Sequence, residues 1–230
     1  MSAFFITGSG TDVGKTFVAA GLIQHWRRRG RVVEALKPVA SGLDPASADA
    51  SDPGVLLTAL GRCINPEAIE RIAPWCFKAP LSPDMAAVRE QRIIDFDALL
   101  GFARRAIANA RDILLIEGVG GVMVPLDREH TVLDWMCALR LPIVLVSGSY
   151  LGSISHTLTC VDVLRRRELH IAALVISESA SSTVPLQEAV ATIARFATPL
   201  AVTAIPRLAP GADEQPSFAR LADLLMRPTE

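Results

Sequence analysis

The sequence predicts an α/β fold, in which one mostly parallel sheet is covered by helices on both faces. Short apolar or β-branched runs alternate along the chain with segments of helical periodicity, as in successive βαβ units. The strand segments are almost continuously apolar, which is typical of strands buried on both faces. The chain has 230 residues, half of them hydrophobic. Because that length suits one core, we interpret residues 1–230 as a single domain.

The expected elements follow this alternation in chain order. We expect strands over Ala3–Thr7, Arg31–Leu36, Asp112–Ile116, Pro142–Ser147, Ile171–Ser177 and Leu200–Ile205. We expect helices over Lys15–Arg29, Pro53–Leu60, Asp95–Ala110, Thr131–Leu139, Ser153–Arg166, Pro185–Phe196 and Phe218–Leu225. Three arginines and Gly30 close the first helix, because cations and a glycine suit a helix C-terminus. Residues 63–92 are proline-rich, and there we expect a short edge strand over Ile69–Phe77 and an exposed loop.

Composition and charge exclude several function classes. The net charge of −1 argues against a general nucleic-acid or membrane-surface role. No apolar run reaches the roughly 18 residues of a membrane span, and the chain enters a strand without a secretory signal. We therefore expect a cytoplasmic protein. The widely spaced cysteines predict buried, reduced thiols rather than a zinc site: Cys63, Cys76, Cys137 and Cys160.

The most informative motif lies between the first expected strand and helix. Residues 8–16 read Gly-Ser-Gly-Thr-Asp-Val-Gly-Lys-Thr. In such a glycine-rich turn, backbone N–H groups and the helix N-terminus bind phosphate oxygens. Lys15 would reach the β- and γ-phosphates, and Thr16 would ligate Mg²⁺. Ser9 stands where the common pattern has its first glycine, so this is a variant P-loop.

The lysines and acids at the predicted strand ends indicate further chemistry. The chain has three lysines among 23 basic residues, and both Lys15 and Lys37 lie at strand ends near the P-loop. Glu117 ends an apolar strand before glycines, as a Walker B acid does, and a turn-capping acid is the alternative. Asp52 precedes a proline and is either a helix cap or a second Mg²⁺ carboxylate. Asp12, beside the phosphates, needs a metal or a cationic partner.

Four segments of the chain form a specific combination. They are the P-loop over Thr7–Thr16, the run Lys37-Pro38-Val39-Ala40-Ser41-Gly42, the run Glu117-Gly118-Val119-Gly120-Gly121, and the run Leu151-Gly152-Ser153-Ile154-Ser155-His156. In this combination the chain resembles the dethiobiotin synthetases of the biotin pathway. The block Pro80-Leu81-Ser82-Pro83 is similar to the family's Ser-Pro loop. The P-loop alone is shared with many ATPases, whereas its combination with Lys-Pro-Val-x-Ser-Gly is far more specific.

The resemblance implies a homodimer of the P-loop NTPase type, with its active site at the subunit interface. It implies ATP- and Mg²⁺-dependent ureido ring closure of 7,8-diaminononanoate with CO₂, through a carbamate and a carbamic–phosphoric anhydride. Lys15 and Lys37 would be catalytic, and Thr16, Asp52 and Glu117 would hold Mg²⁺. Thr11, Lys37, Ser41 and Ser155 would contact the diamine, part of whose site would come from residues 151–156 of the partner subunit.

The same resemblance implies a nucleotide site built from the P-loop and from three other strand ends. Its expected residues are Asp12, Val13, Gly14, Lys15, Thr16, Phe17, Asp52, Glu117, Gly118, Val119, Gly120, Ser177, Pro206, Arg207 and Leu208. The family usually has an asparagine that recognises adenine where this chain has Ser177-Glu178. We therefore expect relaxed base choice, with CTP or GTP supporting turnover within about tenfold of ATP. Ser155 and Asp84 replace the asparagine and the histidine that the family usually has there.

Two other functions compete with this interpretation. Partition and septum-positioning ATPases carry an extra lysine early in the P-loop, where this chain has Ser9, Gly10 or Thr11. Amide ligases of the cobyrinate type add a glutamine amidotransferase domain, for which 230 residues leave no room. Turnover that does not need the diamine would favour the switch ATPase.

Overall fold

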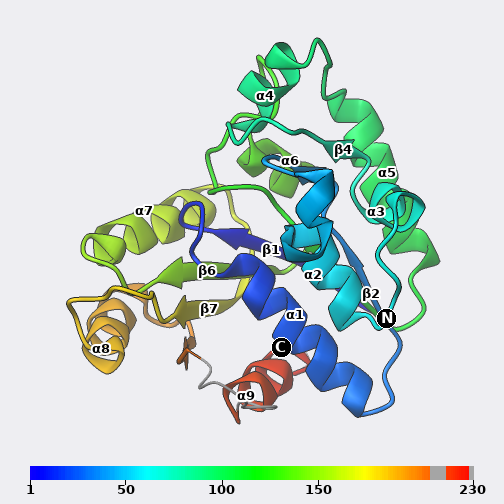
Figure 1. Cartoon of the computed structure of the whole chain (residues 1–230). Coiled ribbons are helices and arrows are strands. Elements are labelled where there is room, and N and C mark those ends of the chain that lie inside the picture. Colours follow the sequence, from blue (N-terminus) through cyan, green and yellow to red (C-terminus); the bar gives the residue numbers. More distant parts are fainter. Residues whose placement is uncertain (208–215, 228–230) are drawn as a thin grey trace.

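A six-stranded parallel sheet forms the centre of the computed structural model, which describes residues 1–207 and 216–227 (Figure 1). Its order is β2-β5-β1-β6-β7-β8, and every pairing is parallel. The strands are β1 (Ser2–Gly8), β2 (Val33–Leu36), β5 (Ile113–Glu117), β6 (Ile143–Gly148), β7 (Ile171–Ser177) and β8 (Val202–Ile205). The predicted fold class is therefore confirmed.

Helices cover both faces of this sheet (Figure 1). From β1 to β2 the chain moves one way along the sheet, and from β5 to β8 it moves the other way. Right-handed crossovers therefore place the first helix on one face and the helices between β5 and β8 on the opposite face. The C-terminal helix packs against the first helix. These helices are α1 (Lys15–Arg28), α2 (Asp52–Ala59), α5 (Phe96–Asn109), α6 (Val132–Leu139), α7 (Ser153–Arg166), α8 (Leu186–Ala197) and α9 (Pro216–Leu225).

The region between β2 and α5 differs most from the sequence prediction. Ile69–Phe77 is not one edge strand, because its first residues belong to a short helix capped by Asn65, whose side chain accepts from the Ala68 N–H at 2.8 Å. The final residues pair in a separate two-stranded parallel sheet. The expected loop also contains a helix. The elements of this region are β3 (Val39–Ala40), η1 (Pro45–Ala50), α3 (Pro66–Ile72), β4 (Trp75–Cys76) and α4 (Pro83–Arg89).

The core lies between the sheet and its helices, and it fixes the strand ends that carry the site. β5 is buried along its whole length, and Trp135 of α6 packs edge-on against Phe5 of β1, with ring centroids 4.9 Å apart. Such an aromatic pair adds about 0.5–1.5 kcal/mol beyond the area it buries. Among the described residues, none of the helices combines the length and apolar character needed to cross a bilayer.

The cysteine prediction is partly wrong. All four thiols are free, as expected, but Cys63 is exposed and the other three are only half-buried. Burial raises the pKa of Cys76 and of Cys160 to about 11, so both thiols are less reactive than a free cysteine. Cys63 is exposed because it lies in the turn between α2 and α3.

Candidate active site

The P-loop lies at the carboxyl end of the central strand, between β1 and α1. Gly14 has a φ of 94°, and a Cβ there would lie 2.6 Å from the Ser177 hydroxyl oxygen, so the turn requires glycine. The Oγ atoms of Ser9 and Ser147 are 2.8 Å apart, and Thr157 donates to Ser147 at 2.6 Å. Ser9, which replaces a glycine of the common motif, thus ties the loop to β6 and α7.

Lys15 begins α1 and folds back into the loop. Its side chain is buried, and Nζ donates to the carbonyl oxygen of Gly10 at 2.8 Å. Burial, followed by repulsion from Lys37, lowers the pKa of Lys15 to about 8. A bound phosphate would relieve this penalty on the charged form, because an opposite charge nearby favours ionisation.

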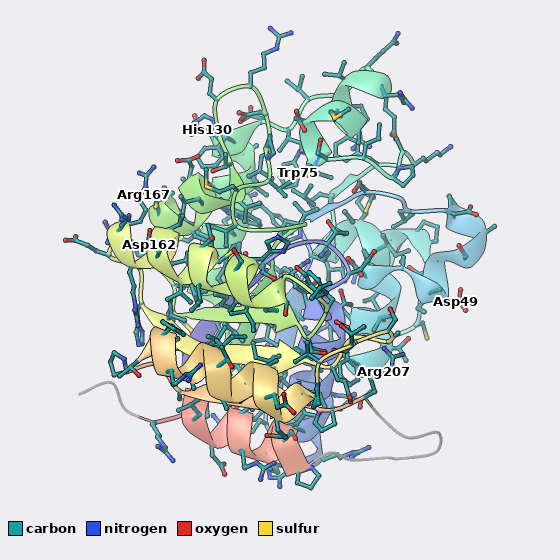
Figure 2. All side chains as sticks on the ribbon, turned by 90° about the vertical axis from the view of Figure 1, so that its left-hand side faces the viewer. Asp49, Trp75, His130, Asp162, Arg167 and Arg207 are labelled. Atoms are coloured by element: carbon teal, nitrogen blue, oxygen red, sulfur yellow. The ribbon has the colours of Figure 1, made fainter. Side chains whose placement is uncertain are left out.

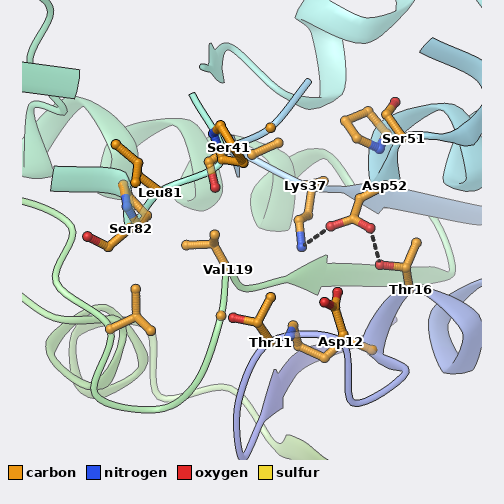
Figure 3. Close-up of a pocket in the computed structure, with 18 of the residues that line it drawn as sticks. Thr11, Asp12, Thr16, Lys37, Ser41, Ser51, Asp52, Leu81, Ser82 and Val119 are labelled. Carbon is orange, nitrogen blue, oxygen red and sulfur yellow. Dashed lines mark hydrogen bonds and ion pairs between the residues drawn. The ribbon is translucent and has the colours of Figure 1, made fainter. Parts of the chain in front are cut away.

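Lys37, which follows β2, is a deeply buried charged group, at 1% exposure. Its Nζ donates to Glu117 Oε1 at 2.6 Å and to the Gly118 carbonyl at 2.8 Å, and it pairs with Asp52 Oδ2 at 2.9 Å (Figure 3). Burial lowers the pKa of Lys37, but the two carboxylates outweigh it and leave the pKa above its usual value. Lys37 is therefore a permanent cation, and it cannot act as a general base near neutral pH.

Thr16 joins the two carboxylates on the opposite side from Lys37. Its hydroxyl oxygen lies 2.7 Å from Asp52 Oδ1 and 2.7 Å from Glu117 Oε1. One hydroxyl has one proton, so it can donate to only one carboxylate at a time. In the described part of the chain, the buried oxygen Glu117 Oε2 has no hydrogen-bond partner. The Thr16 hydroxyl and the two carboxylates thus converge, and some of their oxygen lone pairs accept no hydrogen bond and are available to a cation.

This donor set fits Mg²⁺. A hard cation prefers carboxylate and hydroxyl oxygens, and one would satisfy the orphaned Glu117 oxygen. Within residues 1–207 and 216–227, no group of three or more His, Cys, Asp and Glu side chains could hold a metal ion. A site with only two carboxylates suits Mg²⁺, which usually completes its coordination with water and substrate phosphate.

The structure excludes one of the two interpretations of Asp52, that of a helix cap. The N-cap of α2 is Ser51, whose hydroxyl accepts from the Gly54 N–H at 3.2 Å. Asp52 instead lies in the first turn and faces Thr16 and Lys37. Lys37 and the hydrogen bonds outweigh the effect of burial and lower the pKa of Asp52, so its carboxylate stays ionised.

A cavity of about 930 Å³ opens beside this cluster. Figure 3 shows Ser41, Leu81 and Ser82 on one side of it, with Thr11 and Asp12 on the other. The cavity is also lined by residues that the sequence-based site did not include, although the Ser-Pro block indicated some of them. These additional lining residues are Ala40, Gly42, Ala50, Ser51, Pro53, Pro80, Leu81, Ser82, Pro83 and Val124.

A second cavity, of about 420 Å³, lies on the other side of the P-loop. Asp12, Gly14 and Phe17 line both cavities, so the two meet at the start of α1. The second cavity also reaches the carboxyl end of β7. The rest of its lining is Val13, Ser177, Glu178, Ser179, Ala180 and Arg207.

The structure brings most of the predicted site residues together. Thr11, Ser41, Val119 and Gly120 line the larger cavity. Val13, Ser177 and Arg207 line the smaller one.

Three predicted residues have other positions, and a fourth is outside the described part of the chain. The Gly118 carbonyl accepts from Lys37, Pro206 lines neither cavity, and Ser155 is exposed on α7 and lines neither cavity. Leu208 lies outside the described residues. Glu178 and Ser179 were missing from the predicted site, although their position directly after a buried strand could have indicated them.

Comparison with known proteins identifies close relatives. The family model of an AAA domain matches residues 2–215. The ATP-dependent dethiobiotin synthetase BioD of Acidiphilium cryptum is 54% identical over 188 residues, which are 81% of this chain and 84% of that protein. The Phenylobacterium zucineum enzyme of the same name is 50% identical over 186 residues, 80% of each chain. The one from Pseudomonas aeruginosa is 36% identical over 228 residues, 99% of this chain and 98% of that protein.

Solved structures of more distant proteins share the fold. The septum site-determining protein MinD of Pyrococcus horikoshii, in complex with Mg-ADP, matches with a TM-score of 0.59 at 16% identity, over 98% of this chain and 96% of that chain. The Pyrococcus furiosus cell division ATPase MinD matches with a TM-score of 0.57 at 17% identity, over 98% of each chain. At such low identity the likeness concerns the fold alone.

Proposed function

Because the chain belongs to the family of ATP-dependent dethiobiotin synthetases, we propose that it closes a ureido ring on 7,8-diaminononanoate. CO₂ supplies the ring carbon, and ATP is converted to ADP and phosphate. The observation that carries the proposal is the buried Lys37–Glu117 pair, which the exposed Asp52 carboxylate joins, beside Lys15 and Thr16. The cluster opens into a cavity large enough for a small substrate next to the triphosphate.

In the first step, one amine of the substrate attacks CO₂. A C–N bond forms, a proton leaves to solvent, and the product is a carbamate. The new negative charge lies on oxygen, where the Lys37 ammonium stabilises it without any proton transfer to the protein. The hydroxyls of Thr11 and Ser41, which line the same cavity, orient the diamine.

In the second step, a carbamate oxygen attacks the γ-phosphorus of ATP. The bond to the β–γ bridging oxygen breaks, ADP leaves, and a carbamic–phosphoric anhydride forms. Lys15 binds the β- and γ-phosphates and stabilises the charge that develops between them. Thr16, Asp52 and Glu117 would hold Mg²⁺, which when bound neutralises phosphate charge.

In the third step, the second amine attacks the carbonyl carbon of the anhydride. A second C–N bond forms, the C–O bond to phosphate breaks, and phosphate and a proton leave. The two amines belong to one molecule, so the step is intramolecular, and the cavity wall of Pro80, Leu81 and Ser82 restricts the conformations of the substrate.

We further propose that the protein acts as a homodimer in which residues 151–156 of one subunit complete the diamine site of the other. Two features support this arrangement. Leu151 is a large apolar side chain that is 79% exposed, and Ser155, expected at the substrate, is exposed on α7. An exposed leucine beside an active-site segment suits a covered interface.

An ADP-release assay tests the reaction. The protein is incubated with Mg-ATP and bicarbonate, with or without 7,8-diaminononanoate. We expect ADP release only with the diamine, and the Lys78→Gln variant serves as a control because Lys78 is exposed and lines neither cavity. Equal release without the diamine would contradict the proposal and favour a switch ATPase.

A further inference from the structure

The smaller cavity is the natural place for the base of the nucleotide, and this inference rests on the proposed function. The phosphates occupy the P-loop, with Lys15 and Thr16 at their terminal end. The larger cavity opens at that end, so the nucleoside must leave the loop on the other side. There the smaller cavity begins, at Asp12, Gly14 and Phe17, which line both cavities. The polar groups at the ends of β7 and β8 would then face the base.

The two serines of this cavity are already constrained. Ser177 is 6% exposed, and its hydroxyl packs against the Gly14 backbone, where a Cβ would lie 2.6 Å away. The Ser179 hydroxyl accepts from the Ser149 N–H at 3.0 Å, and the Ser179 N–H donates to the Ser149 hydroxyl at 3.0 Å. Neither serine offers the paired donor and acceptor of an amide side chain.

Glu178 differs from the serines, because it is half-exposed and carries a carboxylate into the cavity lining. Its backbone N–H donates to the Ile205 carbonyl at 2.9 Å, and its Oε2 accepts from the Arg207 N–H at 2.9 Å. Among the described residues, Oε1 makes no hydrogen bond or ion pair. Figure 2 shows Arg207 at the edge of the molecule, on the side where Asp49 lies. The Arg207 N–H thus holds the side chain through Oε2, and Oε1 is available to accept a hydrogen bond from a ligand.

We propose that Glu178 determines base specificity by accepting a hydrogen bond from an exocyclic amine of the base. An ionised carboxylate accepts hydrogen bonds and cannot donate them. The amine of adenine or cytosine is therefore favoured over the carbonyl that hypoxanthine or uracil has at the corresponding position. A carbonyl facing Glu178 would bring two oxygen acceptors together with no proton between them, and both would lose hydrogen bonds to water.

The arrangement also separates adenine from guanine. Guanine has two adjacent hydrogen-bond donors, its ring N–H and its amino group. A carboxylate accepts from both in the favourable bidentate geometry only when both of its oxygens are available. In this structure Arg207 occupies one oxygen of Glu178. Ser177 in place of the family's asparagine predicts relaxed base choice for CTP and GTP alike. The position of Glu178 therefore favours ATP and CTP over GTP, because the Arg207 N–H competes with the second guanine donor.

Two pairs of nucleotides test the inference by direct binding. ATP has an exocyclic amine on its six-membered ring where ITP has a carbonyl, and CTP differs from UTP in the same way. Titration calorimetry with each Mg-nucleotide, without the diamine, measures four dissociation constants. We expect ATP to bind about tenfold or more tightly than ITP, and CTP more tightly than UTP.

The Glu178→Gln variant keeps the size of the side chain and an oxygen for the Arg207 N–H, and its amide can also donate. In this variant we expect the ATP-to-ITP ratio to fall to within about threefold, because the amide can donate to a base carbonyl. Glu188→Gln changes an exposed glutamate on α8 and is the matched control. It should leave the ratio of the parent protein unchanged.

Three results would overturn the inference. They are equal binding of ATP and ITP by the parent protein, tighter binding of GTP than of ATP, and a Glu178→Gln variant that weakens all nucleotides equally with an unchanged ratio. The last result would mean that Glu178 only holds the Arg207 segment. Loss of diamine-dependent ADP release with a preserved ATP-to-ITP ratio would contradict the proposed function and support the base selection. Failure of every nucleotide to bind would contradict both.

Discussion

The two ends of the nucleotide cleft differ in how firmly the protein holds its charged side chains. At the phosphate end, Lys37 and Glu117 are each 1% exposed, and Lys37 contacts two carboxylates and a backbone carbonyl. At the base end, Glu178 is half-exposed and Arg207 is exposed. Buried, prearranged charges interact more strongly than exposed ones, which water and salt screen. We therefore expect the phosphate end to dominate affinity and catalysis, and the base end to contribute selectivity.

The largest effect is expected for Lys15→Ala at the phosphate end. The substitution removes a charge-assisted contact to the β- and γ-phosphates that strengthens in the transition state, worth about 3–4 kcal/mol. Turnover should fall several-hundredfold or more, as measured by ADP release at saturating substrates. Burial disfavours the charged form of Lys15, so its removal should not destabilise the fold. Circular dichroism of the variant checks this. A variant with near-normal turnover would remove Lys15 from the mechanism.

A second substitution separates the two lysines. Lys37→Gln should retain ATP binding but lose about a hundredfold in turnover, because Lys37 stabilises the carbamate. The test compares the dissociation constant of Mg-ATP with kcat for the same variant, with Lys78→Gln as the control. An equal loss of nucleotide affinity and turnover would mean that Lys37 only binds the nucleotide and does not stabilise the carbamate.

The same variant also tests the proposed Mg²⁺ site through stability. Without Lys37, the Asp52 and Glu117 carboxylates lose their cation. The Lys37–Glu117 pair is buried on both sides, and breaking such a pair costs about 3–5 kcal/mol of unfolding free energy, whereas solvent screens the more exposed Asp52. Added Mg²⁺ should replace the lost charge, so it should raise the Tm of Lys37→Gln by more than the Tm of the parent protein. An equal shift in Tm for both proteins would argue against Mg²⁺ at these carboxylates.

A moderate effect is expected from pH. The pKa of Lys15 is about 8 in the free protein, and bound phosphate should raise it. Below this pH the lysine is charged in both states, so the affinity for Mg-ATP should be flat. Above about pH 8, binding must take up a proton, and affinity should weaken by up to about tenfold per pH unit. Titration calorimetry between about pH 7 and pH 9.5 measures the slope.

Lys15→Arg is the control for this slope, because arginine stays charged throughout the range. The variant should bind Mg-ATP with little pH dependence above pH 8, even if its affinity is lower. A slope that persists in Lys15→Arg would assign the pH dependence to another group.

The smallest effect is expected at the base end. The larger share of affinity comes from the phosphates, so CTP should support turnover with a kcat/KM within about tenfold of the value for ATP, a difference of about 1.4 kcal/mol. The comparison is made at saturating diamine. A thousandfold preference for ATP would show that adenine is read by more than the single carboxylate of Glu178.

Much of the phosphate end could be predicted from sequence, because motif spacing and topology determine it together. Glycines, Lys15 and Thr16 lie in one local turn, and parallel strands bring Lys37 and Glu117 to the same sheet edge. The six main strands and seven long helices follow from hydrophobic periodicity, with bounds within two residues. The helix expected from Asp95 begins one residue later, because the Asp95 side chain caps it by accepting from the Ala98 N–H.

Other features depend on contacts between distant segments, which periodicity does not encode. The short sheet of β3 and β4 joins residues that are 36 positions apart, as the register of Val39 with Trp75 shows. The role of Glu178 depends on an N–H that is 29 residues away. The sequence allowed Asp52 to be a helix cap or a Mg²⁺ carboxylate, and only the fold excludes the cap, because Ser51 has that position.

The central claim is that the cluster at the phosphate end closes a ureido ring, and product labelling tests it most directly. The protein is incubated with Mg-ATP, 7,8-diaminononanoate and ¹³C-bicarbonate, and the products are analysed by mass spectrometry. The account predicts dethiobiotin with one ¹³C atom at the ring carbonyl, formed in equal amount to ADP, and about a hundredfold slower formation of this product with Lys37→Gln. ADP formation without a labelled ring product would contradict the account.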